Sequence, residues 1–155
     1  MQGGSAIAVG RTACGVGSHI PDLTIAMNAP TGGVRRLLKA EGLAVAALSV
    51  CLYYLGGYSW GLFGLLLLAP DLSFAGYLTG ARAGAIVYNA LHSYVGPAAV
   101  AAVLLLDDWP PAVPLIWAAH IGIDRALGYG LKYAAGFHET HLGRIGRGVR
   151  VARDR

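Results

Sequence analysis

The amino-acid sequence predicts an all-α protein, a membrane-embedded antiparallel bundle of four transmembrane helices. Hydrophobic residues make up 55% of the 155-residue chain and charged residues only 13%, whereas a soluble domain is about 25% charged. Apolar runs of about 20 residues, the length that crosses a bilayer as a helix, occur four times. The links between these runs are very short, so consecutive helices must lie side by side in opposite directions.

The first 34 residues precede these runs and differ from them in composition. Residues 1–34 are rich in Gly, Ala, Ser and Thr and contain no sustained apolar run. Ala6–Val9 is too short for the apolar region of a secretory signal peptide. We therefore expect a disordered leader. A second interpretation is that translation starts at Met27 and that the stretch before it is a start-site artefact.

The transmembrane domain is expected over residues 35–133. The predicted spans are Arg36–Gly57, Trp60–Gly80, Ala83–Leu106 and Pro111–Lys132. Each is long enough to cross about 30 Å of hydrocarbon at about 1.5 Å per residue. No disulfide framework or zinc-finger pattern competes with this interpretation, because the chain has only two cysteines.

The Lys and Arg residues predict the orientation of the spans. They flank the start of the first span, the link between the second and third, and the end of the fourth, whereas the link before the fourth carries Asp107 and Asp108. Basic residues favour the cytoplasmic side. We therefore expect a multi-pass protein of the bacterial cytoplasmic (inner) membrane with both termini in the cytoplasm. Trp60 and Trp109 fall at the opposite rim, where aromatic belts occur.

Residues 134–155 are predicted to form a basic, amphipathic cytoplasmic tail. Its arginines recur at every third position among apolar residues, at Arg144, Arg147, Arg150 and Arg153. This pattern favours contact with anionic lipid. Nucleic acid is not an expected partner, because no aromatic residues are interleaved with the arginines.

A histidine pair stands at the start of this tail. His138 and His141 are separated by one residue less than the pair of the His-Glu-x-x-His zinc protease motif. We therefore interpret them as interfacial residues rather than as a protease site.

Several polar residues interrupt the apolar spans. A charge at the bilayer centre costs at least about 2.5–3.5 kcal/mol, so such residues face the bundle interior and mark functional sites. Depths counted along the helices place them all in the cytoplasmic half of the membrane. They are Glu41, Asp71, Asn89, His92, His120, Asp124 and Arg125.

Two imidazoles and two carboxylates at one depth are a set that could hold a divalent metal such as zinc. The predicted ligands are Asp71, His92, His120 and Asp124, with Glu41 and Asn89 as supporting polar residues. A metal-bound water would then be the nucleophile of a small membrane enzyme, and Arg125 would act in catalysis by stabilising a developing anion.

Three functional classes stay open at this point. The first is a metal-dependent membrane enzyme or ligand-binding protein, as described above. The second is a non-enzymatic structural subunit, acting as a homo-oligomer or with a membrane partner, in which the polar cluster only specifies helix packing. The third is a proton or small-solute transporter, which the lack of a visible internal repeat disfavours.

A set of short residue blocks contains the polar residues named above. The blocks are Glu41, Ala69-Pro70-Asp71-Leu72-Ser73, Gly76-Tyr77, Tyr88-Asn89-x2-His92, Ala119-His120-x3-Asp124-Arg125-x2-Gly128-Tyr129-Gly130-Leu131-Lys132 and Phe137-x3-His141-Leu142-Gly143. In these blocks the chain resembles a family of small bacterial membrane proteins, the domain-of-unknown-function family 4260. The resemblance runs from about Arg36 to Arg147 and implies a compact membrane domain with no assigned activity.

Overall fold

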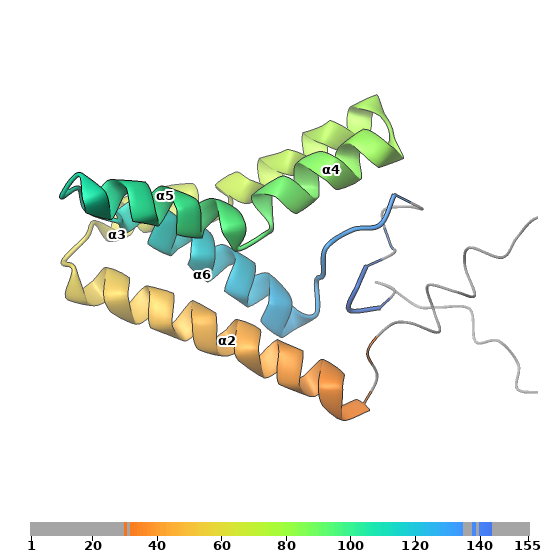
Figure 1. The fold of residues 1–155 in the computed structure, drawn as a ribbon, viewed down its shortest axis with the longest axis horizontal. Helices are drawn as coiled ribbons and strands as arrows, with labels where there is room; N and C mark the ends of the chain where they lie inside the picture. Colours follow the sequence, from red (N-terminus) through yellow and green to blue (C-terminus); the bar gives the residue numbers. More distant parts are fainter. Residues whose placement is uncertain (1–29, 31, 135–137, 139, 144–155) are drawn as a thin grey trace, which may run out of the picture.

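The computed structural model describes residues 30, 32–134, 138 and 140–143, and this part of the chain is helical (Figure 1). The predicted leader, apart from its last residues, and the arginines of the predicted tail lie outside the described residues. The helices are α2 (Gly32–Leu55), α3 (Trp60–Leu66), the 3₁₀ helix η1 (Ala69–Thr79), α4 (Ala81–Leu91), α5 (Val95–Leu106) and α6 (Ala112–Leu127).

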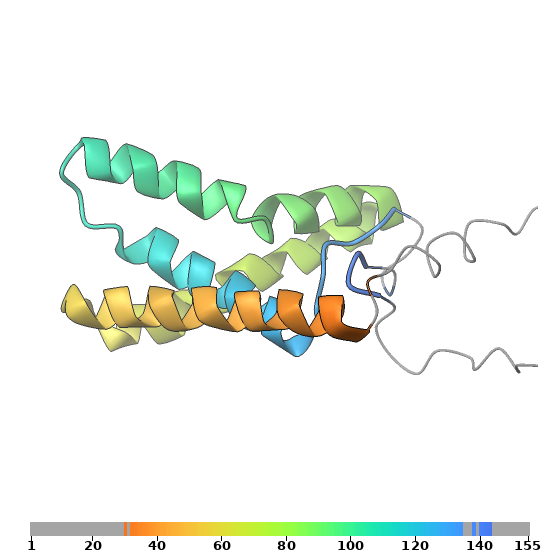
Figure 2. The same cartoon turned by 60° about the horizontal axis from the view of Figure 1, so that its bottom comes forward.

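The chain runs back and forth along the long axis of the molecule four times, which confirms the predicted all-α bundle (Figures 1 and 2). The four runs are α2, α3 with η1, α4 with α5, and α6. Three segments are long and apolar enough to cross a membrane: Gly32–Leu55, Trp60–Thr79 and Ala81–Leu106. Large apolar side chains on them are widely exposed, as at Leu65 (76%) and Leu78 (89%), which suits contact with lipid.

The fourth run is shorter than the predicted span, which reached Lys132. α6 has 16 residues, a length of about 24 Å at 1.5 Å per residue. It ends because Gly128 adopts the left-handed conformation, with φ of 104°, and donates its N–H back to the last turn. α6 is also the most enclosed helix, with eight buried residues. Its polar residues therefore face protein rather than lipid.

Two of the predicted spans are broken in the middle. The second changes from α3 to the 3₁₀ helix η1 just before Pro70, a residue with no N–H to give to a helix. The third is interrupted at residues 92–94, between α4 and α5. From the sequence we expect Pro70 to kink the second helix, whereas nothing indicates the break in the third, because apolar residues run through it. Irregular backbone at membrane depth is tolerated only where protein covers it.

Small residues allow α2 and α6 to cross closely. A Cβ at Gly122 would lie 2.7 Å from the backbone nitrogen of Ala46 and 2.7 Å from the carbonyl oxygen of Gly42. A Cβ at Gly42 would in turn lie 2.4 Å from Cβ of Arg125. Close approach of backbones at small residues is typical of helix packing in membranes. This crossing fixes α6 against α2.

η1 and α4 form a hairpin that projects beyond the other helices (Figure 1). A Cβ at Gly84 would overlap the ring of Tyr77, so the ring packs directly on the α4 backbone. The hairpin positions the end of α4 and the start of η1 beside α6.

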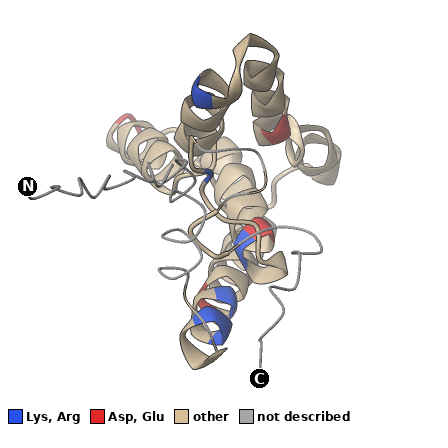
Figure 3. Ribbon diagram, turned by 90° about the vertical axis from the view of Figure 1, so that its right-hand side faces the viewer, with Lys and Arg blue, Asp and Glu red and all other residues tan. Residues whose placement is uncertain are grey.

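Basic residues gather at one end of the molecule. Arg35, Arg36 and Lys39 lie in the first turns of α2, at the end that faces the viewer in Figure 3. The terminal nitrogens of Arg35 and Lys39 also lie beside Gly128, at the end of α6, where cations are favoured by the helix dipole. The link with Asp107 and Asp108 lies at the opposite end (Figure 1). The orientation of the termini in a membrane stays a prediction.

Candidate metal centre

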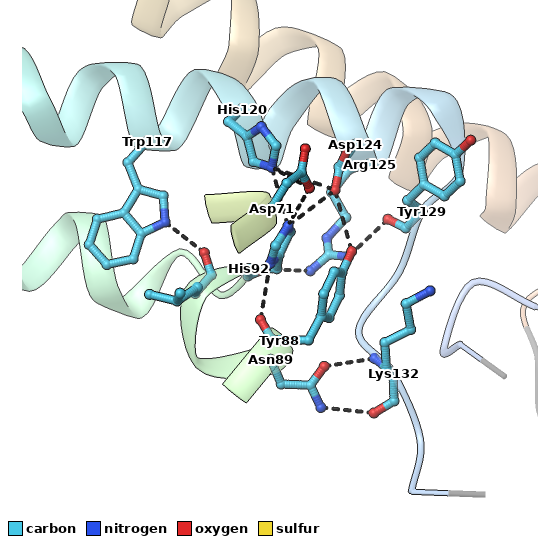
Figure 4. Close-up of polar contacts among 11 residues, drawn as sticks. Asp71, Tyr88, Asn89, His92, Trp117, His120, Asp124, Arg125, Tyr129 and Lys132 are labelled. Atoms are coloured by element: carbon cyan, nitrogen blue, oxygen red, sulfur yellow. Dashed lines mark hydrogen bonds and ion pairs between the residues drawn. The ribbon is translucent and has the colours of Figure 1, made fainter. Parts of the chain in front are cut away.

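Four side chains from three helical runs converge where η1 begins and α4 ends, on one side of α6 (Figure 4). One ligand atom from each of these residues lies within 4.8 Å of all the others. We call these residues the His/Asp cluster: Asp71, His92, His120 and Asp124. They are the four metal ligands predicted from the sequence.

The spacing of these atoms matches a tetrahedral ligand shell. The two Nε2 atoms of His92 and His120 lie 3.2 Å apart. Oδ1 of Asp71 lies 3.5 Å from the first and 3.6 Å from the second, and Oδ2 of Asp124 lies 3.6 and 3.9 Å from them. Tetrahedral zinc with bonds of about 2.0–2.2 Å separates its ligands by about 3.3–3.6 Å. These five distances therefore lie within about 0.3 Å of a tetrahedral shell, and the oxygens of Asp71 and Asp124 lie within 4.8 Å of each other.

The hydrogen bond of His92 prepares its ring for coordination. Nδ1 of His92 lies 3.0 Å from the backbone carbonyl oxygen of Tyr88. A carbonyl oxygen only accepts, so Nδ1 carries the proton and the neutral ring has a bare Nε2, which faces the cluster. A ring nitrogen that donates to a backbone carbonyl is the usual outer partner of a metal-binding histidine.

The end of α4 supplies carbonyl groups that the break leaves without helical partners. The indole N–H of Trp117 donates to the carbonyl oxygen of Leu91 at 2.6 Å. The guanidinium of Arg125 donates to the carbonyl oxygens of His92 and Tyr129, both at 2.9 Å. The bonds to Leu91 and His92 come from α6 and fix the broken end of α4 against it, which holds His92 in place.

The position of Arg125 favours a structural contact over the predicted catalytic one. The residue is only 9% exposed, and the two hydrogen bonds described above go to backbone carbonyl groups. Stabilisation of a developing anion by Arg125 stays a prediction.

Tyr88 is a member of the site that was not among the site residues predicted from the sequence. Its ring stacks on His92 with centroids 3.8 Å apart. Its hydroxyl group donates to Oδ2 of Asp124 at 3.4 Å. The signal was its position four residues before His92, one helical turn away. Tyr88 thus contacts one histidine and one carboxylate of the cluster.

Asn89 supports the site indirectly. Its side-chain amide donates to the carbonyl oxygen of Lys132 at 2.8 Å and accepts from the N–H of Lys132 at 2.7 Å. This pair of bonds attaches the segment after α6 to α4. Asn89 therefore contacts the backbone of the segment after α6 and not the four ligand atoms.

The other predicted residues lie away from the cluster. Glu41 is exposed on α2 and lines a different pocket, beside Gly42 and His141. Nδ1 of His141 accepts a hydrogen bond from the N–H of Leu131 at 2.8 Å. Burial, with the nearby charge of Arg125, lowers the pKa of His141 below its ordinary value. His138 is exposed.

The burial of the cluster is uneven. The side chains of His92 and His120 are 1% and 5% exposed, whereas those of Asp124 and Asp71 are 18% and 35% exposed. Donor chemistry of two imidazoles and two carboxylates suits zinc and other first-row divalent ions. The Asp71 side is therefore the side from which a ligand could reach the cluster.

Comparisons with curated proteins and with solved structures find no match to this chain. A family model described as "Domain of unknown function (DUF4260)" matches residues 35–145. This range is more than half of the 155 residues and includes the whole His/Asp cluster. The chain belongs to the DUF4260 family of domains of unknown function.

Proposed function

We propose that this protein is an integral membrane protein that binds one divalent metal ion, zinc in the first place, at the His/Asp cluster. The observation that carries the proposal is the 3.2 Å separation of the two Nε2 atoms, with a carboxylate oxygen from each aspartate close to both. A bound divalent ion supplies Lewis-acid chemistry and lowers the pKa of a bound water.

The protein's own residues give this proposal further support. His92 has its proton on the ring nitrogen that faces away from the cluster, and Tyr88 donates to one carboxylate. The more exposed Asp71 makes the shell accessible on one side. The four protein ligands fill a tetrahedral shell, so a further ligand would bind on the exposed Asp71 side as a fifth donor, a coordination number that zinc also adopts.

Metal analysis of the protein purified in neutral detergent tests the proposal. We expect about one zinc per chain in the parent protein and a loss of at least tenfold in zinc affinity in Asp124→Asn, because a neutral amide oxygen is a poor zinc ligand. The matched control is Asp107→Asn in the link between α5 and α6, which should keep the parent's zinc content. A parent protein that neither contains zinc nor binds it on addition contradicts the proposal.

A packing network is the second candidate, and one contact favours it. The His120 ring can donate from Nε2 to Nε2 of His92 at 3.2 Å without any ion. In that case the metal-free protein depends on this bond, and His120→Ala costs about 1–3 kcal/mol of unfolding free energy. A metal site predicts instead that His120→Ala lowers stability mainly when zinc is present, because bound metal stabilises the folded state by mass action.

The membrane orientation is part of the proposal. The basic residues of α2 and the acidic link before α6 support a bacterial inner-membrane protein with both termini in the cytoplasm. Reporter fusions after Arg155 should give a cytoplasmic signal, and reporters within residues 107–110 should give an external one. A cytoplasmic signal from residues 107–110 would overturn this orientation.

A further inference from the structure

An apolar pocket lies beside the His/Asp cluster. Its volume is about 200 Å³, and its lining is apolar. The residues that matter here come from the start of η1, the end of α4 and the first half of α6: Ala69, Pro70, Leu91, Val113, Ile116 and Trp117. We call it the apolar pocket.

The apolar pocket and the cluster are built from neighbouring residues on every element. Pro70 precedes Asp71, and Leu91 precedes His92. On α6, Val113, Trp117 and His120 recur at the spacing of one helix face, which continues to Asp124. The apolar pocket and the His/Asp cluster therefore lie next to each other along α6, the pocket toward Val113 and the cluster toward Asp124.

The pocket has the size and the access that an alkyl chain requires. An apolar protein cavity of about 150 Å³ binds benzene, so about 200 Å³ accommodates several methylene groups. Val113 is 46% exposed, which places one wall of the pocket at the outer surface of the helices. In a membrane this surface meets lipid, so a chain can enter sideways.

We infer that the site binds a single-chain amphiphile with a carboxylate-like head, an inference that rests on the proposed metal site. The head coordinates the ion from the more exposed Asp71 side, and the first part of the chain fills the apolar pocket. A divalent ion balances the two aspartates, so an anionic head adds to a neutral centre rather than to a negative one. One chain is specified because the pocket has room for only a short segment.

Binding of alkyl hydroxamates to the cobalt-loaded protein tests this inference. Hydroxamates coordinate divalent ions through two oxygens, and visible absorption of Co²⁺ reports a change in its ligands. The series from two to eight carbons is titrated in one neutral detergent. We expect the eight-carbon compound to bind about 50-fold more tightly than the two-carbon compound, which corresponds to burial of about three methylene groups.

Two variants show whether the chain-length effect comes from burial in the apolar pocket or from burial in the detergent. Ala69→Phe fills the pocket, so it should lose most of the chain-length advantage and bind the two-carbon compound within about twofold of the parent. Leu105→Phe changes an exposed side chain of α5 and should keep the full advantage. Val113→Phe gives a second filled pocket if Ala69→Phe does not fold, as judged by its cobalt content.

The outcomes distinguish this inference from the proposed function. If Co²⁺ binds and the short hydroxamate changes its spectrum, but filling the pocket leaves the chain-length effect unchanged, the inference is wrong and the metal site stands. The same holds if chain length has no effect in the parent protein. If no Co²⁺ binds, the proposed function fails and the inference fails with it.

Discussion

Two faces of α6 make contacts of different kinds, one with α2 and the other with η1 and α4. Toward α2, Gly122 lies against the backbones of Gly42 and Ala46 with no space for a side chain. Toward η1 and α4, the same helix presents His120 and Asp124 to other polar side chains. The first side is a steric contact between backbones, and the second is a set of directed polar contacts.

This difference separates the part of the protein that fixes α6 from the part that the helix positions. Without water, helices in a membrane associate through close packing and polar contacts. The glycine side supplies rigid packing that depends on no ionisation state. The polar side can therefore hold histidine and aspartate side chains that a bound metal ion would stabilise, without loss of the helix packing. We expect substitutions on the first side to damage the fold and those on the second side to change metal binding.

The largest effect is expected from Gly122→Leu. The new side chain would meet backbone atoms of α2, which cannot rotate away, so overpacking should cost about 3 kcal/mol of unfolding free energy. The measurement is reversible unfolding in mixed micelles. Gly64→Leu is the matched control, because a Cβ at Gly64 has nothing within 4 Å. Equal stability of the two variants would show that α2 and α6 do not cross as described.

A smaller effect on stability and a larger one on metal affinity are expected from Arg125→Met. The change removes both hydrogen bonds to backbone carbonyls but leaves the four ligands. Hydrogen bonds from charged groups contribute about 1.5–3 kcal/mol each, but Met also removes a buried charge, which offsets much of this loss. Loss of outer-shell support lowers metal affinity about 10-fold to 100-fold. Zinc titration measures the affinity. Parent affinity in this variant would show that Arg125 does not position His92.

The smallest expected effect is a pH dependence in the stability of the segment after α6. Burial and the charge of Arg125 lower the pKa of His141 in the folded protein below the ordinary 6.5. The unfolded chain therefore binds the proton more readily than the folded one. As a result, the stability that neutral His141 gives to the folded segment is complete above about pH 6.5 and declines as the pH falls below it.

Hydrogen exchange at Leu131, corrected for the intrinsic rate, measures this contribution. Protection should fall below about pH 6.5, because the N–H of Leu131 donates to Nδ1 of His141 and protonation removes that acceptor. His141→Ala should abolish the pH dependence, whereas His138→Ala should keep it. A pH dependence that survives in His141→Ala would assign it to another group.

The sequence predicted the members of the cluster because depth along a helix can be counted from hydropathy. Asp71, His92, His120 and Asp124 lie at similar depths, and the bundle closes around them. Depth does not give direction around the helix axis. For this reason Glu41 was predicted as a supporting residue although it lies away from the cluster. It is next to Gly42, the residue of α2 that faces α6, and is itself exposed.

The breaks in the helices were harder to predict. Leu67 and Leu68 continue the apolar run of α3 without a polar signal, and only Pro70 indicated an irregularity. The partners of Trp117 and Arg125 depend on the break at His92, because only a broken helix has free carbonyl groups there. Without that break, Arg125 could only be assigned to a charge partner or to an anion.

X-ray absorption at the zinc edge of the zinc-loaded protein tests the central claim most directly. We predict a first shell of nitrogen and oxygen at about 2.0–2.1 Å, with the outer scattering of two imidazole rings. In His92→Ala the imidazole contribution should fall by half. A shell of sulfur at about 2.3 Å, or a shell of oxygen without imidazole scattering, would contradict the assignment of zinc to His92, His120, Asp71 and Asp124.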